Sequence, residues 1–165
     1  MSHLKIGRKA PQFSLPGADG RTLADMAGHP VVVFFYPQDG TRACTVEATA
    51  FSALSPEFVE RGAVVVGISP DSDARHQWFA RKHDLSIPLV ADPQLKIAKA
   101  YGVWGDKVLF GRHYKGIIRT TFLIGRDGRV AQVWSKVRVA NHAAAVLAAV
   151  GELETPGTKS APASS

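Results

Sequence analysis

The chain has 165 residues, 45% hydrophobic and 21% charged, so it is long enough for one ordinary domain and is neither disordered nor fibrous in composition. It contains one cysteine, Cys44, which excludes an internal disulfide, a CxxC redox pair and a thiolate zinc cage. The net charge of +6 invites a nucleic-acid interpretation. The excess is concentrated between Lys107 and Arg138, where eight basic residues accompany one acidic residue without a tandem basic run. We therefore do not expect nucleic-acid binding.

No segment of the sequence predicts a membrane span or an export signal. The first ten residues contain no apolar stretch before a small-residue cleavage site. The longest apolar runs, Val31 to Tyr36 and Ala143 to Val150, are far shorter than the roughly 20 residues that span a bilayer. We expect a soluble protein of the cytoplasm, where thiols stay reduced.

The first third of the chain changes from a strand pattern to a helix pattern. Pro11 to Leu15 is expected to be a short extended piece before a turn. Val31 to Tyr36 is an unbroken run of β-branched and aromatic residues between two prolines, which predicts a fully buried central strand. The next segment, Thr41 to Leu54, has a helical period. Its apolar face is predicted to consist of Val46, Ala50, Ala53 and Leu54.

The middle of the chain continues the alternation of helix and strand. Ser55-Pro56 is expected to cap and restart the helix. Ala63 to Ser69 predicts a second buried strand, and Asp73 is suited to cap a helix that runs to about Asp84. Ile87 to Val90 predicts a third strand. Pro93 to Tyr101 predicts a helix that begins with proline and ends before glycine.

The last third predicts two strands and a helix. Ile117 to Ile124 and Val130 to Ser135 are strand patterns joined by Gly125 to Gly128, which is a hairpin signal. Asn141 is expected to cap a final helix that ends at Gly151. The segment 151–165 is poor in apolar residues and is expected to be a disordered tail.

The order of these elements predicts the fold class. The first strands alternate with helices and should be parallel, whereas the last two should be antiparallel. We expect an α/β protein with a thioredoxin-like fold, in which a central mixed sheet is flanked by helices. Residues 1–150 should form its single domain.

Cys44 lies where the first buried strand gives way to the start of a helix. Free backbone N–H groups at a helix start carry partial positive charge and favour an anion such as a thiolate, which is the nucleophilic form of cysteine. Arg42 adds positive charge nearby. A lone cysteine is otherwise more often an inert buried side chain that packs as a small hydrophobe. The residues around Cys44 decide between these interpretations.

Pro37, Thr41 and Cys44 form the motif P-x-x-x-T-x-x-C. On this motif the chain resembles a peroxiredoxin, and the resemblance extends from Gly7 to about Val150. The segment Ala98 to Trp104 is similar to the bacterioferritin-comigratory-protein branch, also called peroxiredoxin Q. The resemblance implies that the cysteine attacks the O–O bond of a peroxide.

The same resemblance implies roles for other residues. Thr41 would hydrogen-bond the peroxide and the sulfur, Pro37 would shield the thiolate from water, and backbone N–H groups near Ala43 would bind the substrate oxygens. Arg119, inside an apolar strand pattern, matches the arginine that holds thiolate and peroxide together, because a guanidinium stays charged and offers fixed donors. Glu47, three residues after the cysteine, is a second substrate-binding candidate that would orient the arginine.

Two departures from the family pattern are informative. The family usually has Thr-Pro-Gly or Thr-Pro-Val before the cysteine, whereas this chain has Thr41-Arg-Ala. Relatives often carry a second, resolving cysteine at positions that correspond to Thr49 or to the neighbourhood of Ala80 here. A sulfenic acid on Cys44 therefore has no internal thiol to resolve it, whether this absence is native or engineered.

We therefore expect a thiol-dependent peroxidase that reduces hydrogen peroxide and organic hydroperoxides. The partner would be an external thiol, namely thioredoxin, glutaredoxin or glutathione, and the protein would be a monomer or a weak dimer. Two alternatives remain: a thiol–disulfide exchanger, and a basic interaction module on the same fold with little or no catalysis. No cofactor is implied.

The histidines do not suggest a metal site. The sequence contains six, and no pair has the i, i+4 spacing of a helical metal site. His76 and His83 are seven residues apart, without an evident third ligand. We expect no bound metal.

Overall fold

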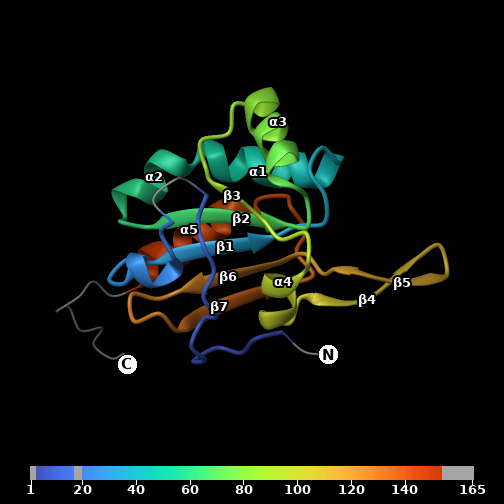
Figure 1. Ribbon diagram of the computed structural model, residues 1–165. Coiled ribbons are helices and arrows are strands. Elements are labelled where there is room, and N and C mark those ends of the chain that lie inside the picture. Colours follow the sequence, from blue (N-terminus) through green and yellow to red (C-terminus); the bar gives the residue numbers. More distant parts are fainter. Residues whose placement is uncertain (1–2, 17–19, 154–165) are drawn as a thin grey trace.

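The computed structural model describes residues 3–16 and 20–153, which form a twisted sheet covered on both faces (Figure 1). The five-stranded sheet has the order β3 (Leu89–Ala91), β2 (Val64–Ser69), β1 (Val31–Phe35), β6 (Thr120–Ile124) and β7 (Val130–Ser135). The pairs β1–β2 and β2–β3 are parallel, whereas β1–β6 and β6–β7 are antiparallel. The predicted mixed sheet and the directions of its strands are confirmed.

The helices divide between the two faces of the sheet (Figure 1). They are η1 (Leu23–Met26), α1 (Arg42–Ala53), α2 (Ser55–Glu60), α3 (Asp73–His83), α4 (Lys96–Ala100) and α5 (His142–Glu152). Buried residues of α1, α2, α3 and α5 belong to one hydrophobic cluster, and those of η1 and α4 belong to the cluster on the opposite face. Cys44 lies in the first of these clusters.

Strand β1 is the centre of the molecule because it is buried on both faces. Val31, Val33 and Phe35 point into one cluster, and the residues between them point into the other. On the neighbouring strand β2, Gly67 packs against the ring of Phe34. A Cβ atom on Gly67 would lie 2.7 Å from the ring of Phe34, so a larger residue there would displace the strand. This packing fixes the end of β1, from which the chain enters the segment that carries Cys44.

A hairpin that the sequence did not predict precedes β6. It consists of β4 (Trp104–Leu109) and β5 (Arg112–Ile117), which form a separate two-stranded antiparallel sheet. The strand predicted over Ile117 to Ile124 is therefore wrong in its first part, since β5 ends at Ile117 and β6 begins at Thr120. The hairpin escaped notice because its strands are largely exposed and lack a continuous apolar face.

Several predicted boundaries and faces also need correction. Helix α1 buries Cys44, Glu47, Ala48 and Phe51, whereas Val46, placed on the predicted apolar face, is 43% exposed. Phe51 packs against Phe34 of β1 with ring centroids 4.6 Å apart, and this contact sets the rotation of the helix. The short extended piece predicted at Pro11 to Leu15 makes one isolated bridge, between Ser14 and Thr22.

The predicted helix ends were right to within a few residues, but most caps were not. Ser72, not Asp73, caps α3, because its side chain accepts a hydrogen bond from the Arg75 N–H. The prediction for Pro93 to Tyr101 shortens to α4, Lys96–Ala100. Asn141 holds the predicted cap position before α5, and Leu54 rather than Ser55 holds the one before α2, but neither side chain makes a capping bond.

Helix α5 continues through Gly151 to Glu152, so the predicted end at that glycine is wrong. Gly151 packs close to the guanidinium of Arg61, where a Cβ atom would lie 3.4 Å from Arg61 Nε. Of the predicted tail, residues 154–165 lie outside the described residues. Within the part that the structure describes, no helix is both long enough and apolar enough to cross a membrane.

Candidate active site

Cys44 is the third residue of α1 and is 1% exposed. The chain leaves β1, passes Tyr36 and Pro37, and turns into the helix at Thr41, which is the residue before its first turn. The predicted position of the cysteine at a helix start is confirmed. The free backbone N–H groups of that first turn therefore surround the thiol with partial positive charge.

Arg119 reaches the cysteine from just before β6, whose first residue, Thr120, pairs with Phe35 at the end of β1. Its Nη2 atom donates to Cys44 Sγ at 3.3 Å, and its Nη1 atom donates to Glu47 Oε1 at 2.7 Å. The residue does not lie inside a strand, as the sequence pattern had suggested, but in the two-residue link between β5 and β6. One guanidinium thus joins a thiol and a carboxylate that lie one helical turn apart on α1.

Burial sets the electrostatics of this trio. It raises the pKa of the Glu47 carboxyl to about 7, although the charge and hydrogen bond of Arg119 act in the opposite direction. Burial alone lowers the pKa of Arg119, but the facing Cys44 and Glu47 outweigh it and raise this pKa above its ordinary value. Glu47 Oε2 is buried and has no hydrogen-bond partner among the residues that the structure describes. The site therefore keeps one polar oxygen unsatisfied next to the thiol.

The other predicted site residues lie around the entrance to α1. Thr41 is exposed, and its hydroxyl donates to the Gln38 carbonyl at 3.0 Å instead of capping the helix. Pro37 is half-buried, and Ala43 is exposed. Helix α1 starts one residue after Thr41 and includes Ala43 in its first turn. The structure thus places these residues on the same short segment as Cys44. Of the predicted site residues, Arg119 bonds to the thiol, and it also bonds to Glu47.

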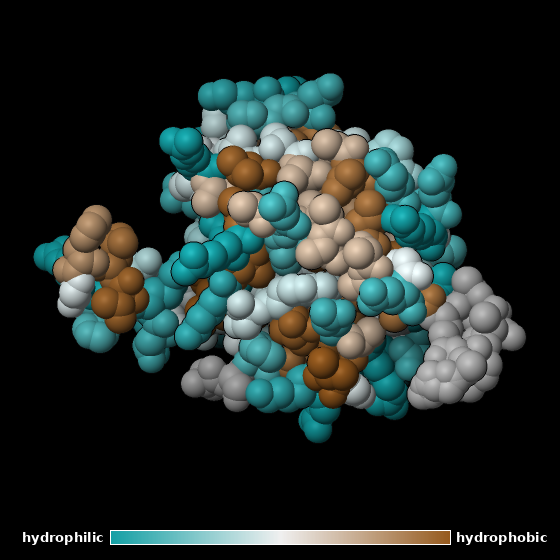
Figure 2. Space-filling view, turned by 180° about the vertical axis from the view of Figure 1, so that it is seen from behind, coloured by the Kyte–Doolittle hydropathy of each residue, from teal (hydrophilic) through white to brown (hydrophobic). Residues whose placement is uncertain are grey.

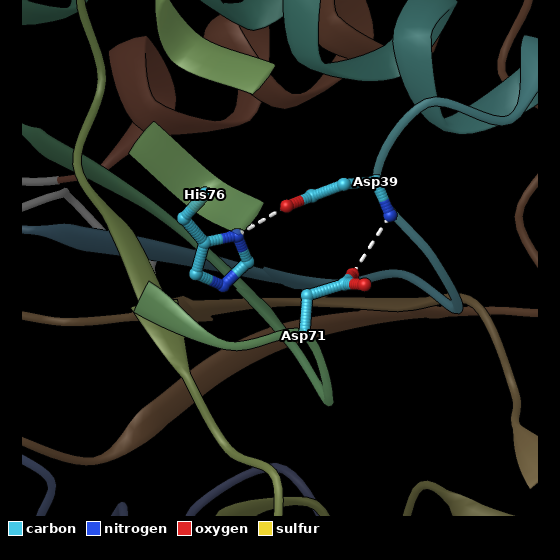
Figure 3. Close-up of side chains that lie close together, drawn as sticks. All are labelled: Asp39, Asp71 and His76. Carbon is cyan, nitrogen blue, oxygen red and sulfur yellow. Dashed lines mark hydrogen bonds and ion pairs between the residues drawn. The ribbon is translucent and has the colours of Figure 1, made fainter. Parts of the chain in front are cut away.

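A second buried polar cluster, which the sequence analysis did not identify, holds the loop before Cys44 (Figure 3). Asp39 is 1% exposed, and its carboxylate accepts from the Tyr36 hydroxyl at 2.5 Å and pairs with His76 Nδ1 at 2.6 Å. Its backbone N–H donates to Asp71 Oδ2 at 2.7 Å, and that oxygen also accepts from the Ser69 hydroxyl. The cluster joins the loop to the end of β2 and to α3.

The imidazole of His76 has acceptors on both sides. Its Nε2 lies 3.1 Å from the Val90 carbonyl, which can only accept, so Nε2 carries a proton. A further proton lies between Nδ1 and the Asp39 carboxylate, on one partner or the other. Donor atoms of Asp39, Asp71 and His76 lie within 4.8 Å of one another, a spacing compatible with a metal ion. These atoms already hydrogen-bond one another or their neighbours, so the cluster is best described as a hydrogen-bonded network.

One signal in the sequence could have located this network. Asp39 follows the first predicted buried strand, and Asp71 follows the second. Because β1 and β2 are parallel, the segments after them meet at the same edge of the sheet. His76 carries no such signal, because only the docking of α3 against β3 brings it to Asp39.

His142 is a further buried titratable group near the site. It lies at the start of α5, and its Nε2 is 2.8 Å from the Thr121 hydroxyl. Burial, and secondarily the charge of Arg119, lower the pKa of His142 to about 4. The imidazole is therefore neutral at physiological pH and acts as a packed polar residue between Phe51 and Trp134.

A cavity of about 810 Å³ lies away from this site. It is lined by residues around η1, the start of β1 and the turn between β6 and β7, including Leu23, Val31 and Gly128. None of its lining residues belongs to the Cys44 site or to the Asp39 network. The thiol and its charged neighbours lie together at the opposite end of β1, which is therefore the candidate active site.

Comparison with known proteins agrees with this geometry. Residues 6–133 match the profile of the AhpC/TSA family, which is more than half of the chain. The chain belongs to this family. Peroxiredoxin Bcp of Bacillus subtilis is 44% identical to it over 87% of this chain and 93% of the relative. Peroxiredoxin Bcp of Xanthomonas campestris is 44% identical over 84% and 86%, respectively.

Solved structures show the same relationship. Peroxiredoxin Q of Xanthomonas campestris superposes with a TM-score of 0.81 at 41% identity, covering 88% of this chain and 96% of that chain. BcpB of Mycobacterium tuberculosis superposes with a TM-score of 0.78 at 36% identity, covering 92% and 99%. The protein is therefore a peroxiredoxin of the Bcp, or peroxiredoxin Q, branch, with the predicted thioredoxin-like fold and one cysteine, Cys44.

Proposed function

We propose that Cys44 is the peroxidatic residue of this peroxiredoxin and that its substrates are hydrogen peroxide and organic hydroperoxides. The Cys44 thiolate attacks one peroxide oxygen, the O–O bond breaks, and the other oxygen leaves with a proton as water or an alcohol. The sulfur becomes a sulfenic acid. The contact between Arg119 Nη2 and Cys44 Sγ at 3.3 Å carries this proposal. It places a permanently charged donor where the breaking O–O bond would lie.

The neighbouring residues have supporting roles in this proposal. Arg119 holds the thiolate and the peroxide, and Glu47 orients the guanidinium through its 2.7 Å hydrogen bond. The hydroxyl of Thr41 turns from the Gln38 carbonyl toward the bound peroxide. Pro37 limits the access of water, and backbone N–H groups in the turn that contains Ala43 bind the substrate oxygens. A related structure, of the Xanthomonas campestris bacterioferritin comigratory protein, concerns alkyl peroxide reduction, which supports alkyl hydroperoxides as a substrate class.

Regeneration of Cys44 needs an external thiol, since the chain has no second cysteine. The incoming thiolate attacks the Cys44 sulfur, water leaves, and a mixed disulfide forms; a second thiol then releases the Cys44 thiolate. We propose thioredoxin, glutaredoxin or glutathione as the reductant, and a cytoplasmic protein that is monomeric or weakly dimeric. Because Cys44 is 1% exposed, the start of α1 must open locally before the reductant can reach the sulfur.

Replacement of the sulfur tests the proposal. Cys44→Ser is expected to abolish peroxide consumption in the presence of a supplied dithiol, because a serine hydroxyl does not form a nucleophilic anion at neutral pH. Thr49 is a half-buried residue on the same helix. Thr49→Ser is therefore the matched control and should retain activity. Intact mass after one equivalent of peroxide should show oxygen on the wild-type thiol only. Sustained turnover by Cys44→Ser would remove Cys44 from the mechanism.

A further inference from the structure

The β4–β5 hairpin projects from the body of the molecule on the side where β1 ends (Figure 1). Its strands pair with each other in a separate sheet. In the view from behind, the projecting arm carries hydrophobic residues at its end (Figure 2). Three consecutive apolar residues there are strongly exposed: Val108 at 60%, Leu109 at 54% and Phe110 at 95%. Such a contiguous apolar tip does nothing for the folding of this domain.

The residue at the first position of the turn at the tip does not suit the backbone conformation of that turn. Leu109 pairs with Arg112, so Phe110 and Gly111 form a two-residue turn, and both have positive φ, +52° and +76°. Asn-Gly or Asp-Gly suits such a turn, whereas a bulky residue in the left-handed region is strained. Phe110 is therefore neither the residue that the backbone prefers nor one that is buried. A strained and exposed aromatic side chain points to a role in contact with another molecule.

One face of the hairpin continues from this tip back to the active site. Pairing across the strands puts Lys107 beside Tyr114 and Leu109 beside Arg112 on that face. The ammonium of Lys107 donates to the Ile117 carbonyl at 2.8 Å, two residues before Arg119. Burial and the charge of Arg119 lower the pKa of Lys107, whereas negative charge at Cys44 acts in the opposite direction. The base of the face therefore lies within the electrostatic range of the reacting thiol.

The charges of the hairpin define what it can bind. Its acidic residue, Asp106, is paired with Lys115 at 3.1 Å on the other face. Lys107 and Arg112 on the active-site face have no carboxylate opposite them in the strand pairing. A complementary partner would therefore present an apolar centre with acidic groups at its edge. Aromatic residues and arginine are the types enriched at the centres of protein interfaces.

We propose that Leu109, Phe110, Arg112 and Tyr114 form a docking face for a protein dithiol reductant with an acidic rim. This inference rests on the proposed function, which requires an external thiol at Cys44. Phe110 lies three residues beyond Lys107, roughly 10 Å at the rise of a β-strand. A protein interface of ordinary size, about 800 Å² on each side, is long enough to cover this face from its base to its tip, whereas a small thiol is not. The hairpin thus selects and orients the reductant without touching the peroxide.

The chemistry of the docked step is balanced by the two thiols of the partner. The first thiolate attacks the sulfenic sulfur of Cys44, and water leaves as the mixed disulfide forms. The second thiolate attacks the partner's own sulfur in that disulfide and displaces the Cys44 thiolate. The partner leaves as an intramolecular disulfide, oxidised by two electrons, and the peroxiredoxin returns to its reduced state.

Phe110→Asn provides the sharpest test, since Asn-Gly is the preferred sequence of this turn and the hairpin keeps its fold. Arg112→Glu is the second variant, and Val59→Asn, which removes a 69% exposed apolar side chain from α2, is the matched control. Peroxide turnover is driven by thioredoxin with its reductase and NADPH, by glutaredoxin with glutathione, or by dithiothreitol. The rate of the peroxide step is measured separately by stopped flow.

We expect Phe110→Asn and Arg112→Glu to raise the KM for the protein reductant by about 10-fold or more. The peroxide step, the turnover with dithiothreitol and all rates of Val59→Asn should be unchanged. An unchanged KM in both variants would overturn the proposal, as would a wild-type enzyme that accepts only small thiols. Binding of the wild type, but not of Phe110→Asn, to anionic phosphatidylglycerol vesicles with unchanged reductant kinetics would assign the tip to a membrane surface instead. A wild-type enzyme without any peroxide step would reject the proposed function itself.

Discussion

Two buried polar clusters lie on either side of the segment between β1 and α1, and they differ in how completely their atoms are paired. In the network of Asp39, Asp71 and His76, both carboxylate oxygens of Asp39 and both ring nitrogens of His76 have hydrogen-bond partners. In the cluster of Cys44, Glu47 and Arg119, one oxygen of Glu47 has no partner in the described part of the chain, and the thiol accepts a hydrogen bond from Arg119.

The difference indicates what each cluster does. A fully paired buried network gains nothing from a ligand, and any change in it leaves a buried group unsatisfied, so it holds the loop in one position. An incompletely paired cluster costs folding free energy, which is recovered when substrate oxygens supply the missing partners. We infer from this difference that the saturated network supports the segment and that the unsaturated cluster takes part in the proposed reaction. Substitutions in both clusters test this division.

The largest effect is expected at Arg119. Arg119→Met removes both donors, and we expect the peroxide step to slow by about 100-fold or more, as when a preorganised donor to a transition state is lost. Arg119→Lys keeps the charge but offers a point donor instead of a fork that reaches sulfur and carboxylate together, so it should recover little of the rate. Stopped-flow measurement of thiol consumption reports the step directly.

Arg138 is exposed and lies outside the cluster. Arg138→Lys is therefore the control and should leave the peroxide step unchanged. Because Arg119→Met leaves the buried Glu47 without its partner, urea unfolding of both Arg119 variants is measured as well, so that a loss of rate is not mistaken for a loss of folding. A peroxide step of unchanged rate in Arg119→Met would show that the Cys44 cluster is a structural pair like the other, and the comparison between the two clusters would fail.

Substitutions in the saturated network are expected to have an intermediate effect. They should lower the stability of the protein and, to a smaller extent, the rate of the peroxide step. Asp39→Asn breaks a buried pair and should lower the free energy of unfolding by about 3–5 kcal/mol. His76→Asn keeps a donor near the position of Nδ1, toward Asp39, whereas His76→Gln keeps one near Nε2, toward Val90. Because the bond to Asp39 holds the loop, His76→Asn should retain the faster peroxide step, and His76→Gln should lose about 10-fold by displacing the loop.

Urea unfolding measures the stability of the two histidine variants, and stopped flow measures their peroxide step. Together they distinguish an effect on the position of the loop from an effect on overall stability. Equal stability with unequal rates would show that the contact to Asp39 positions the loop. If the rates of both variants simply follow their stabilities, the network contributes to folding alone.

The sequence was informative about the fold where apolar patterns were continuous. The run from Val31 to Tyr36 predicted a central strand buried on both faces, and the alternation of elements predicted the mixed sheet, both of which are confirmed. The hairpin β4–β5 was missed because exposed strands carry no apolar period. The buried face of α1 was missed for the opposite reason. Val46 was as plausible as Glu47 from periodicity, and only the packing of Phe51 on Phe34 decides between them.

The site was predictable to the extent that its residues follow the motif. Pro37, Thr41 and Cys44 are close together along the chain, and the resemblance also singled out Arg119, 75 residues further on, whose contact with the thiol the structure then shows. Asp39 lies inside the same motif, yet its partner His76 belongs to a helix whose position depends on tertiary packing. The sequence therefore predicted the groups that react and overlooked the groups that hold them.

The smallest effect, and the most direct measure of incomplete pairing, is expected from Glu47→Gln. Burial raises the pKa of Glu47 from its model-compound value of 4.5 to about 7, so folding favours the protonated form. The stabilisation is then complete below pH 4.5 and is lost as the pH rises through 7. The loss is at most about 3–4 kcal/mol, because one pKa unit corresponds to about 1.4 kcal/mol. Glutamine keeps an acceptor for Arg119 without titrating.

The measurement is the free energy of unfolding of both proteins between pH 5 and 8.5, with the exposed Glu60→Gln as a control. The difference between Glu47→Gln and wild type should increase in favour of the variant as the pH rises through 7, and Glu60→Gln should follow the wild type. His142 titrates in the acid range, with its pKa lowered to about 4, and affects both proteins alike. A constant difference across this range would mean that Arg119 keeps Glu47 ionised throughout. The Cys44 cluster would then be as well satisfied as the Asp39 network, and its reactivity would have to come from the thiol and the helix start alone.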